Sequence, residues 1–207
     1  MAFCKSSPTI RTYIVSILAP QSVSMKTERL KEVLSQEGNQ ISPLPPGIPL
    51  LQSTIKPRPP VPGLLPICDG PLILESQLIK ERDTIDGGWT IWPVRSSVWL
   101  TRFTEVLADN WKGLSVSRPN NPILPTLKGI PLARLDGGKG PSNLQSPEMN
   151  TIIESPPGWR TLTLICWDIE YLKGRPWNNS VAWQTLWQRR LKRAPEIANL
   201  DKIPKLD

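Results

Sequence analysis

The side chains that usually carry out catalysis near neutral pH are poorly represented in this sequence. The 207 residues contain no His, and the three cysteines, Cys4, Cys68 and Cys166, are too far apart to form a metal-binding motif. Without imidazole, a Ser-His-Asp triad, a Cys-His pair and a His-based zinc site are excluded within this chain. Carboxylate catalysis and a metal site with oxygen ligands alone remain open.

Asp168 and Glu170 form the candidate carboxylate pair, because alternate residues of a strand lie on one face. A solvated strand end explains the same spacing without any chemistry. The glycine runs Gly87-Gly88 and Gly137-Gly138-Lys139-Gly140 lack the spacing of phosphate-binding loops and are typical of turns. We therefore expect no enzyme, no cofactor and no metal site.

A basic, proline-rich motif predicts a docking site for a protein partner. In Lys56-Pro57-Arg58-Pro59-Pro60-Val61-Pro62, two prolines follow Lys56 at positions +3 and +6. A polyproline II helix has three residues per turn, so Pro59 and Pro62 lie on one ridge while Lys56 and Arg58 reach an acidic pocket. SH3-type domains bind this shape. The alternative is a proline-dense linker that matches the pattern by chance.

A basic cluster near the C-terminus predicts a second binding surface. Residues 172–207 contain eight Lys or Arg against three Asp or Glu, so most of the net charge of +7 lies there. Cations with exposed indoles suit phosphates and nucleobases. The candidate nucleic-acid-binding residues are Trp183, Trp187, Arg189, Arg190, Lys192 and Arg193. The cluster also fits a nuclear-import signal, a membrane-surface helix, a partner helix, or a core-facing stripe with a solvated basic end.

The N-terminal elements expected from the sequence are a strand and a short helix. Residues 10–18 are rich in β-branched and aromatic types, which predicts a strand. Ser24 is the expected cap of a helix that reaches about Glu37 and stops at Gly38. Residues 42–71 contain ten prolines, so there we expect no helix or central strand, only an extended polyproline-like arm.

The remaining elements place the aromatic and basic residues. Apolar residues at spacings of three and four predict an amphipathic helix over 98–111, capped by Ser96 or Ser97. Residues 114–158 are rich in Pro and Gly and predict loops. Residues 161–172 are apolar on both sides, which favours a strand buried on both faces at the centre of the core.

The last expected element is a second amphipathic helix. Over 180–193 the apolar residues recur at helical spacing, the final turns are basic, and Pro195 supplies the stop.

Together these elements predict a small, irregular, single α+β domain with Trp-rich amphipathic helices, a buried strand near the C-terminus and a proline-rich arm. The expected division is an N-terminal strand and helix over 1–41, the arm over 42–71, and a Trp-bearing core with a basic C-terminal helix over 72–207. The sequence contains no run of 18 or more apolar residues, so no membrane span is predicted. An odd cysteine count without a clear secretory signal favours the cytoplasm or the nucleus.

Composition favours a binding protein over an enzyme. The chain has 24 Pro and nine Trp but no His, a skew that fits a reading frame overlapped by another gene, as in compact viral genomes. The expected function is therefore that of an accessory or adaptor protein, viral in this interpretation, which binds host regulatory proteins through its proline-rich segment and aromatic surfaces. The alternative is an RNA- or DNA-binding protein that uses the basic C-terminal helix.

Overall fold

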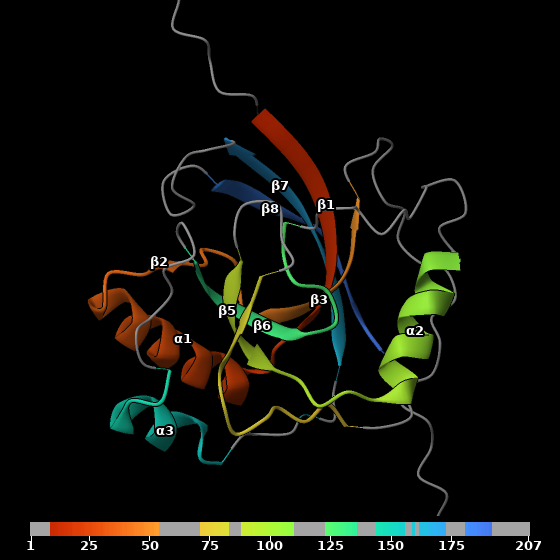
Figure 1. Ribbon diagram of the computed structural model, residues 1–207. Helices are drawn as coiled ribbons and strands as arrows, with labels where there is room; N and C mark the ends of the chain where they lie inside the picture. Colours follow the sequence, from red (N-terminus) through yellow and green to blue (C-terminus); the bar gives the residue numbers. More distant parts are fainter. Residues whose placement is uncertain are drawn as a thin grey trace, which may run out of the picture.

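The computed structural model describes residues 9–53, 71–82, 88–109, 123–135, 144–155, 159, 162–172 and 181–191, which form three helices and two antiparallel sheets (Figure 1). Sheet A contains, in order, β3 (Gly47–Ser53), β1 (Thr9–Leu18), β7 (Thr163–Leu172) and β8 (Val181–Arg190). Sheet B contains β2 (Gln40–Ile41), β6 (Gly129–Arg134), β5 (Trp89–Pro93) and β4 (Ile79–Glu81). The helices are α1 (Gln21–Gln36), α2 (Val98–Asp109) and α3 (Pro147–Ile153). The architecture is α+β, as the sequence predicts.

The long pair β1 and β7 forms the middle of sheet A. The two strands pair along their whole length, from Thr9 opposite Leu172 to Leu18 opposite Thr163. Side chains alternate between the two faces of a strand. The buried apolar side chains form two clusters, a larger and a smaller one. Cys166 lies in the larger cluster and its neighbour Trp167 in the smaller cluster, and both residues are buried. The strands predicted over 10–18 and 161–172 are therefore confirmed, and β7 is covered on both faces.

The helices lie at the flanks of the sheets. Figure 1 shows α1 and α3 close together and α2 on the other side of the molecule, and α1 and α3 contact each other. The helix α1 begins directly after Pro20, so the predicted cap at Ser24 is wrong. Its end is as predicted, because Gly38 has a φ of 79° and donates its N–H to the carbonyl of Ser35. No helix in the described ranges is long and apolar enough to cross a membrane.

The helix predicted over 98–111 is present as α2. The hydroxyl of Ser97 accepts the N–H of Leu100 at 3.4 Å, which is the N-cap interaction expected for this serine. The buried side chains of α2 include Leu100, Phe103 and Leu107, so the apolar stripe faces the core. The described part of the helix ends at Asp109, and Trp111 lies outside the described residues.

Two strands occupy segments for which the sequence predicted an extended polyproline-like arm or loops. The strand β3 lies inside 42–71 and is an edge strand, so the prediction of no helix or central strand is not contradicted there, but residues 47–53 belong to the sheet and not to an arm. The strand β6 and the helix α3 lie inside 114–158, so the loops predicted there are wrong at these positions. Each strand begins with Gly-Ile-Pro-Leu and forms a bulge at the Leu, which is skipped in the pairing with β1 or β5. Proline is tolerated at bulges and on edge strands, and β3 is the edge of sheet A.

The segment predicted as the C-terminal helix is the strand β8, so that prediction is also wrong. It pairs with β7 from Val181 opposite Tyr171 to Arg190 opposite Thr163. A bulge at Leu186 shifts the register between Cys166 and Trp167. Residues four apart on a regular strand share a face, but the bulge places Trp187 on the opposite face from Trp183. In the sequence the same spacing of four matches the apolar stripe of a helix.

Candidate functional site

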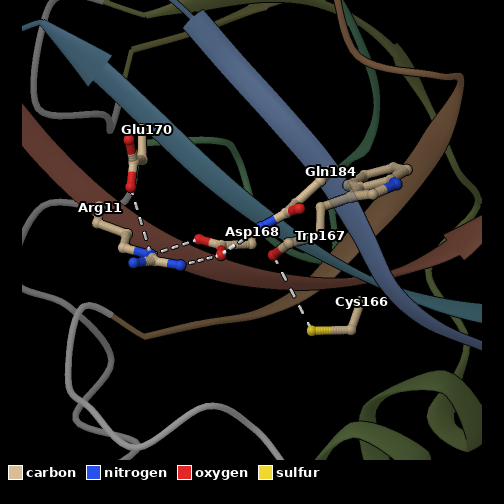
Figure 2. Close-up of polar contacts among 6 residues, drawn as sticks. All are labelled: Arg11, Cys166, Trp167, Asp168, Glu170 and Gln184. Carbon is tan, nitrogen blue, oxygen red and sulfur yellow. Dashed lines mark hydrogen bonds and ion pairs between the residues drawn. The ribbon is translucent and has the colours of Figure 1, made fainter.

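A cluster of polar side chains connects β1, β7 and β8 near one end of sheet A. We call Arg11, Asp168, Glu170 and Gln184 the polar cluster, and Figure 2 shows their side chains directed toward one another. The guanidinium of Arg11 donates from Nε to Asp168 Oδ1 at 2.8 Å and from Nη2 to Oδ2. Gln184 Nε2 donates to the same Oδ2 at 3.2 Å, while Glu170 Oε1 lies 3.6 Å from Arg11 Nε.

Burial determines the role of each charge in the polar cluster. The side chain of Asp168 is 3% exposed, whereas those of Arg11 and Glu170 are 40% and 49% exposed. A buried carboxylate needs a charged, hydrogen-bonded partner, which the bidentate contact with Arg11 supplies. The hydrogen bond with Asp168 raises the pKa of Arg11, so the guanidinium stays charged. The two carboxylates predicted as a pair thus share one arginine, an arrangement typical of a structural ion pair.

A shallow hollow of about 250 Å³ lies beside the polar cluster, lined by Asp168, Glu170, Ala182, Trp183 and Gln184. The strand register explains where it opens. Arg11 lies opposite Glu170, and Glu170 lies opposite Ala182, so these residues form one row across the sheet. The methyl group of Ala182 is the shortest side chain in this row. Two carboxylates and one guanidinium also give the cluster a net negative charge on a chain of net charge +7.

The strand β8 is far more exposed than its neighbour β7. Seven of its ten residues are exposed, whereas β7 has one exposed residue in ten. Sheet A ends at β8, and within the described ranges no strand pairs with its outer edge. The first half, from Val181 to Thr185, precedes the bulge and keeps a regular register with β7. This half therefore presents an exposed sheet edge of regular register beside the hollow.

The predicted nucleic-acid-binding residues do not share one face. Trp183 is 40% exposed, whereas Trp187 is buried in the larger apolar cluster. Arg189 and Arg190 are both exposed, but they lie opposite Leu164 and Thr163, which are consecutive residues of β7. Consecutive strand residues point to opposite faces, so these two arginines do not lie on one face of the sheet. Lys192 and Arg193 lie outside the described residues.

The predicted protein-binding residues Lys56, Arg58, Pro59 and Pro62 also lie outside the described residues. Sequence reasoning missed Arg11 entirely, because its partner Asp168 is 157 positions away and only the strand register brings them together. In the described part of the chain, no three Cys, Asp or Glu side chains are grouped so that they would bind a metal ion. A scan with models of known protein families finds no match for this chain, and a search of curated proteins finds no significant similarity.

Proposed function

We propose that the protein is an accessory or adaptor protein that binds other proteins and has no catalytic activity of its own. The observation that carries this proposal is the exposed first half of β8, Val181–Thr185, at the end of sheet A. An unprotected strand edge offers a row of backbone donors and acceptors to an extended peptide, which adds to the sheet as a further strand. The exposed indole of Trp183 adds the kind of large aromatic surface that is enriched in protein interfaces.

The geometry of sheet A favours a protein partner over a nucleic acid. Sheets that bind single-stranded RNA present aromatic side chains from neighbouring strands on an open face. Here β7, next to β8, is buried on both faces, so the open surface is one strand wide. The two arginines of β8 point to opposite faces as well. Nucleic-acid binding is therefore the second candidate, supported by the positive charge of residues 172–207.

The proline-rich motif supports a second contact in the same function. It begins at Lys56, soon after β3 ends at Ser53, and β3 is the edge of sheet A opposite β8. Its sequence suits an SH3-type domain, as in many adaptor proteins. The skewed composition supports a viral origin, and host regulatory proteins in the cytoplasm or nucleus would then be the partners.

Site-specific photo-crosslinking in the full chain tests this proposal. Trp183 is replaced with p-benzoylphenylalanine, and Val98, which is 80% exposed on α2, receives the same group as the matched control. After irradiation in nuclease-treated cell extract, we expect one discrete protein adduct from position 183 and none of that size from position 98. If position 183 gives no protein adduct and the untreated extract gives RNA adducts instead, the protein-binding proposal is wrong and the second candidate replaces it.

A further inference from the structure

We infer that Val181–Thr185 accepts a partner strand that places a basic side chain over Ala182, facing Glu170, and an apolar side chain against Trp183. This inference rests on the proposed function and specifies the chemistry of the partner. It is independent of the proline-rich motif, which lies elsewhere in the chain.

The strand edge supplies the frame for such a partner. Val181 to Thr185 lie opposite Tyr171 to Trp167 without a register shift, and Ala182 to Thr185 are all exposed. Five residues at about 3.4 Å each give an edge of roughly 17 Å, the length of a common strand. The bulge at Leu186 ends this regular edge, since a bulge re-aims the backbone. A partner strand of about five residues therefore fits the first half of β8.

The charges of the polar cluster select a basic residue on one face. Arg11 uses both Nε and Nη2 in hydrogen bonds to Asp168, whereas its nearest approach to Glu170 is 3.6 Å. Glu170 is half exposed, so its carboxylate is incompletely neutralised. A partner residue opposite Ala182 extends the row formed by Arg11, Glu170 and Ala182. The backbone of this partner residue lies two strand spacings, about 10 Å, from the backbone of Glu170. A Lys or Arg side chain and the Glu170 side chain together span that distance.

The opposite face selects an apolar residue. Trp183 lies opposite Ile169, on the other side of the sheet from Ala182, and its side chain is 40% exposed. The partner residue next to the basic one points to this face and covers the indole, because strand side chains alternate. Aromatic cross-strand pairs with β-branched residues stabilise a sheet, while like charges directly opposite destabilise it. The expected partner thus alternates apolar and basic residues, and an acidic residue facing Glu170 is disfavoured.

Three fluorescein-labelled nine-residue peptides test this inference by fluorescence anisotropy with the full chain. The first alternates Val and Lys, the second has Glu in place of Lys, and the third is the first with every second backbone nitrogen methylated. We expect the Val-Lys peptide to bind at least tenfold more tightly than the other two, because it alone combines a complementary charge with free backbone donors.

Variants of the full chain assign this preference to the edge of β8. Glu170→Gln lowers the affinity for the Val-Lys peptide by about fivefold, the effect of losing one exposed ion pair. The control Glu105→Gln removes an exposed glutamate of α2 and leaves this affinity unchanged. Glu170→Lys reverses the preference toward the Val-Glu peptide, a gain that a misfolded chain cannot produce.

Three results would each overturn the inference. The Val-Glu peptide or the methylated peptide binds as tightly as the Val-Lys peptide, or Glu105→Gln loses as much affinity as Glu170→Gln. The crosslinking and peptide experiments together distinguish failure of the inference from failure of the proposed function. A protein adduct at position 183 together with peptides that show no charge preference rejects the basic strand but keeps the protein-binding function. Absence of the adduct rejects the function itself.

Discussion

Asp168 shows how one buried charge determines the conformation of side chains on three strands. Its carboxylate is 3% exposed and accepts from Arg11 on β1 and from Gln184 on β8. Arg11 must stay in place, because removing one partner of a buried ion pair leaves an uncompensated charge. The hydrogen bond from Gln184 adds a side-chain contact to the backbone pairing of β7 with β8, next to the edge that we propose as a binding site.

A double-mutant cycle on Arg11 and Asp168 tests this coupling. Arg11→Met should lower the melting temperature, because the Asp168 carboxylate stays buried without its cation. Adding Asp168→Asn should restore part of the loss, since the double variant has no buried charge at this position. Glu170→Gln alone should change the melting temperature little, because its side chain is half exposed. Losses that simply add up in the double variant would show that the two residues are not coupled.

Among the residues that the structure describes, Lys31 is the other buried charged residue. Its ammonium donates to the carbonyl of Leu44 at 3.0 Å and to Glu28 Oε1 at 2.9 Å, and the residue is 5% exposed. Burial lowers the pKa of Lys31 from its usual 10.5, and the hydrogen bond to Glu28 offsets part of that change. Folding therefore favours loss of this proton.

The sign of the pH dependence follows from that direction. Below the folded-state pKa of Lys31 both states hold the proton, and above 10.5 neither does. Between these values the unfolded chain holds a proton that the folded chain has released, so the free energy of unfolding rises with pH. Relative to Lys31→Met, the native chain should become more stable as pH rises toward 10.5, as measured by urea unfolding at several alkaline pH values. A constant difference between the two proteins would contradict the lowered pKa.

Several elements were predictable from the sequence because each has a local signal. The β-branched run of β1, the apolar run of β7 and the spacing of α2 depend only on neighbouring residues. The signal for β3 and β6 was the repeated Gly-Ile-Pro-Leu, which proline density obscured. The strand β8 was mistaken for a helix because its bulge depends on pairing with β7, a contact that local spacing does not reveal.

Gly129 tests why β6 begins with glycine. Its φ is 154°, and a Cβ there would overlap the carbonyl oxygen of Trp92 and lie 2.7 Å from Pro93 Cα. Gly129→Ala should cost about 3 kcal/mol of unfolding free energy, because the clash is with backbone of the paired strand β5. Gly38→Ala is the control: φ is 79° but the site is open, so about 1 kcal/mol is expected. Equal losses would show that φ alone, and not the contact, requires glycine at Gly129.

At the scale of the whole molecule, the two sheets share one apolar interior with two clusters. The smaller cluster combines Ile165, Trp167 and Ile169 of β7 with Trp89 and Ile91 of β5. The sequence identified 161–172 as the centre of the core, yet it gave no sign that a second sheet covers one of its faces. All four strands of sheet B are six residues or shorter. The strands β5 and β6 hold proline, and β2 and β4 are too short for a periodic signal.

Trp167 and Trp183 separate the stability of the molecule from its proposed function. Trp167 is 1% exposed, belongs to the cluster that joins the two sheets, and has its ring near Gly47. Trp167→Ala should therefore cost about 3–5 kcal/mol of unfolding free energy, measured by urea denaturation, since it leaves a large cavity between the layers. Trp183→Ala should change the free energy of unfolding by only about 0.5 kcal/mol, because its indole is 40% exposed. The same variant should bind the Val-Lys peptide less tightly. A Trp183→Ala variant as unstable as Trp167→Ala would mean that the edge of β8 is part of the core and unavailable to a partner strand.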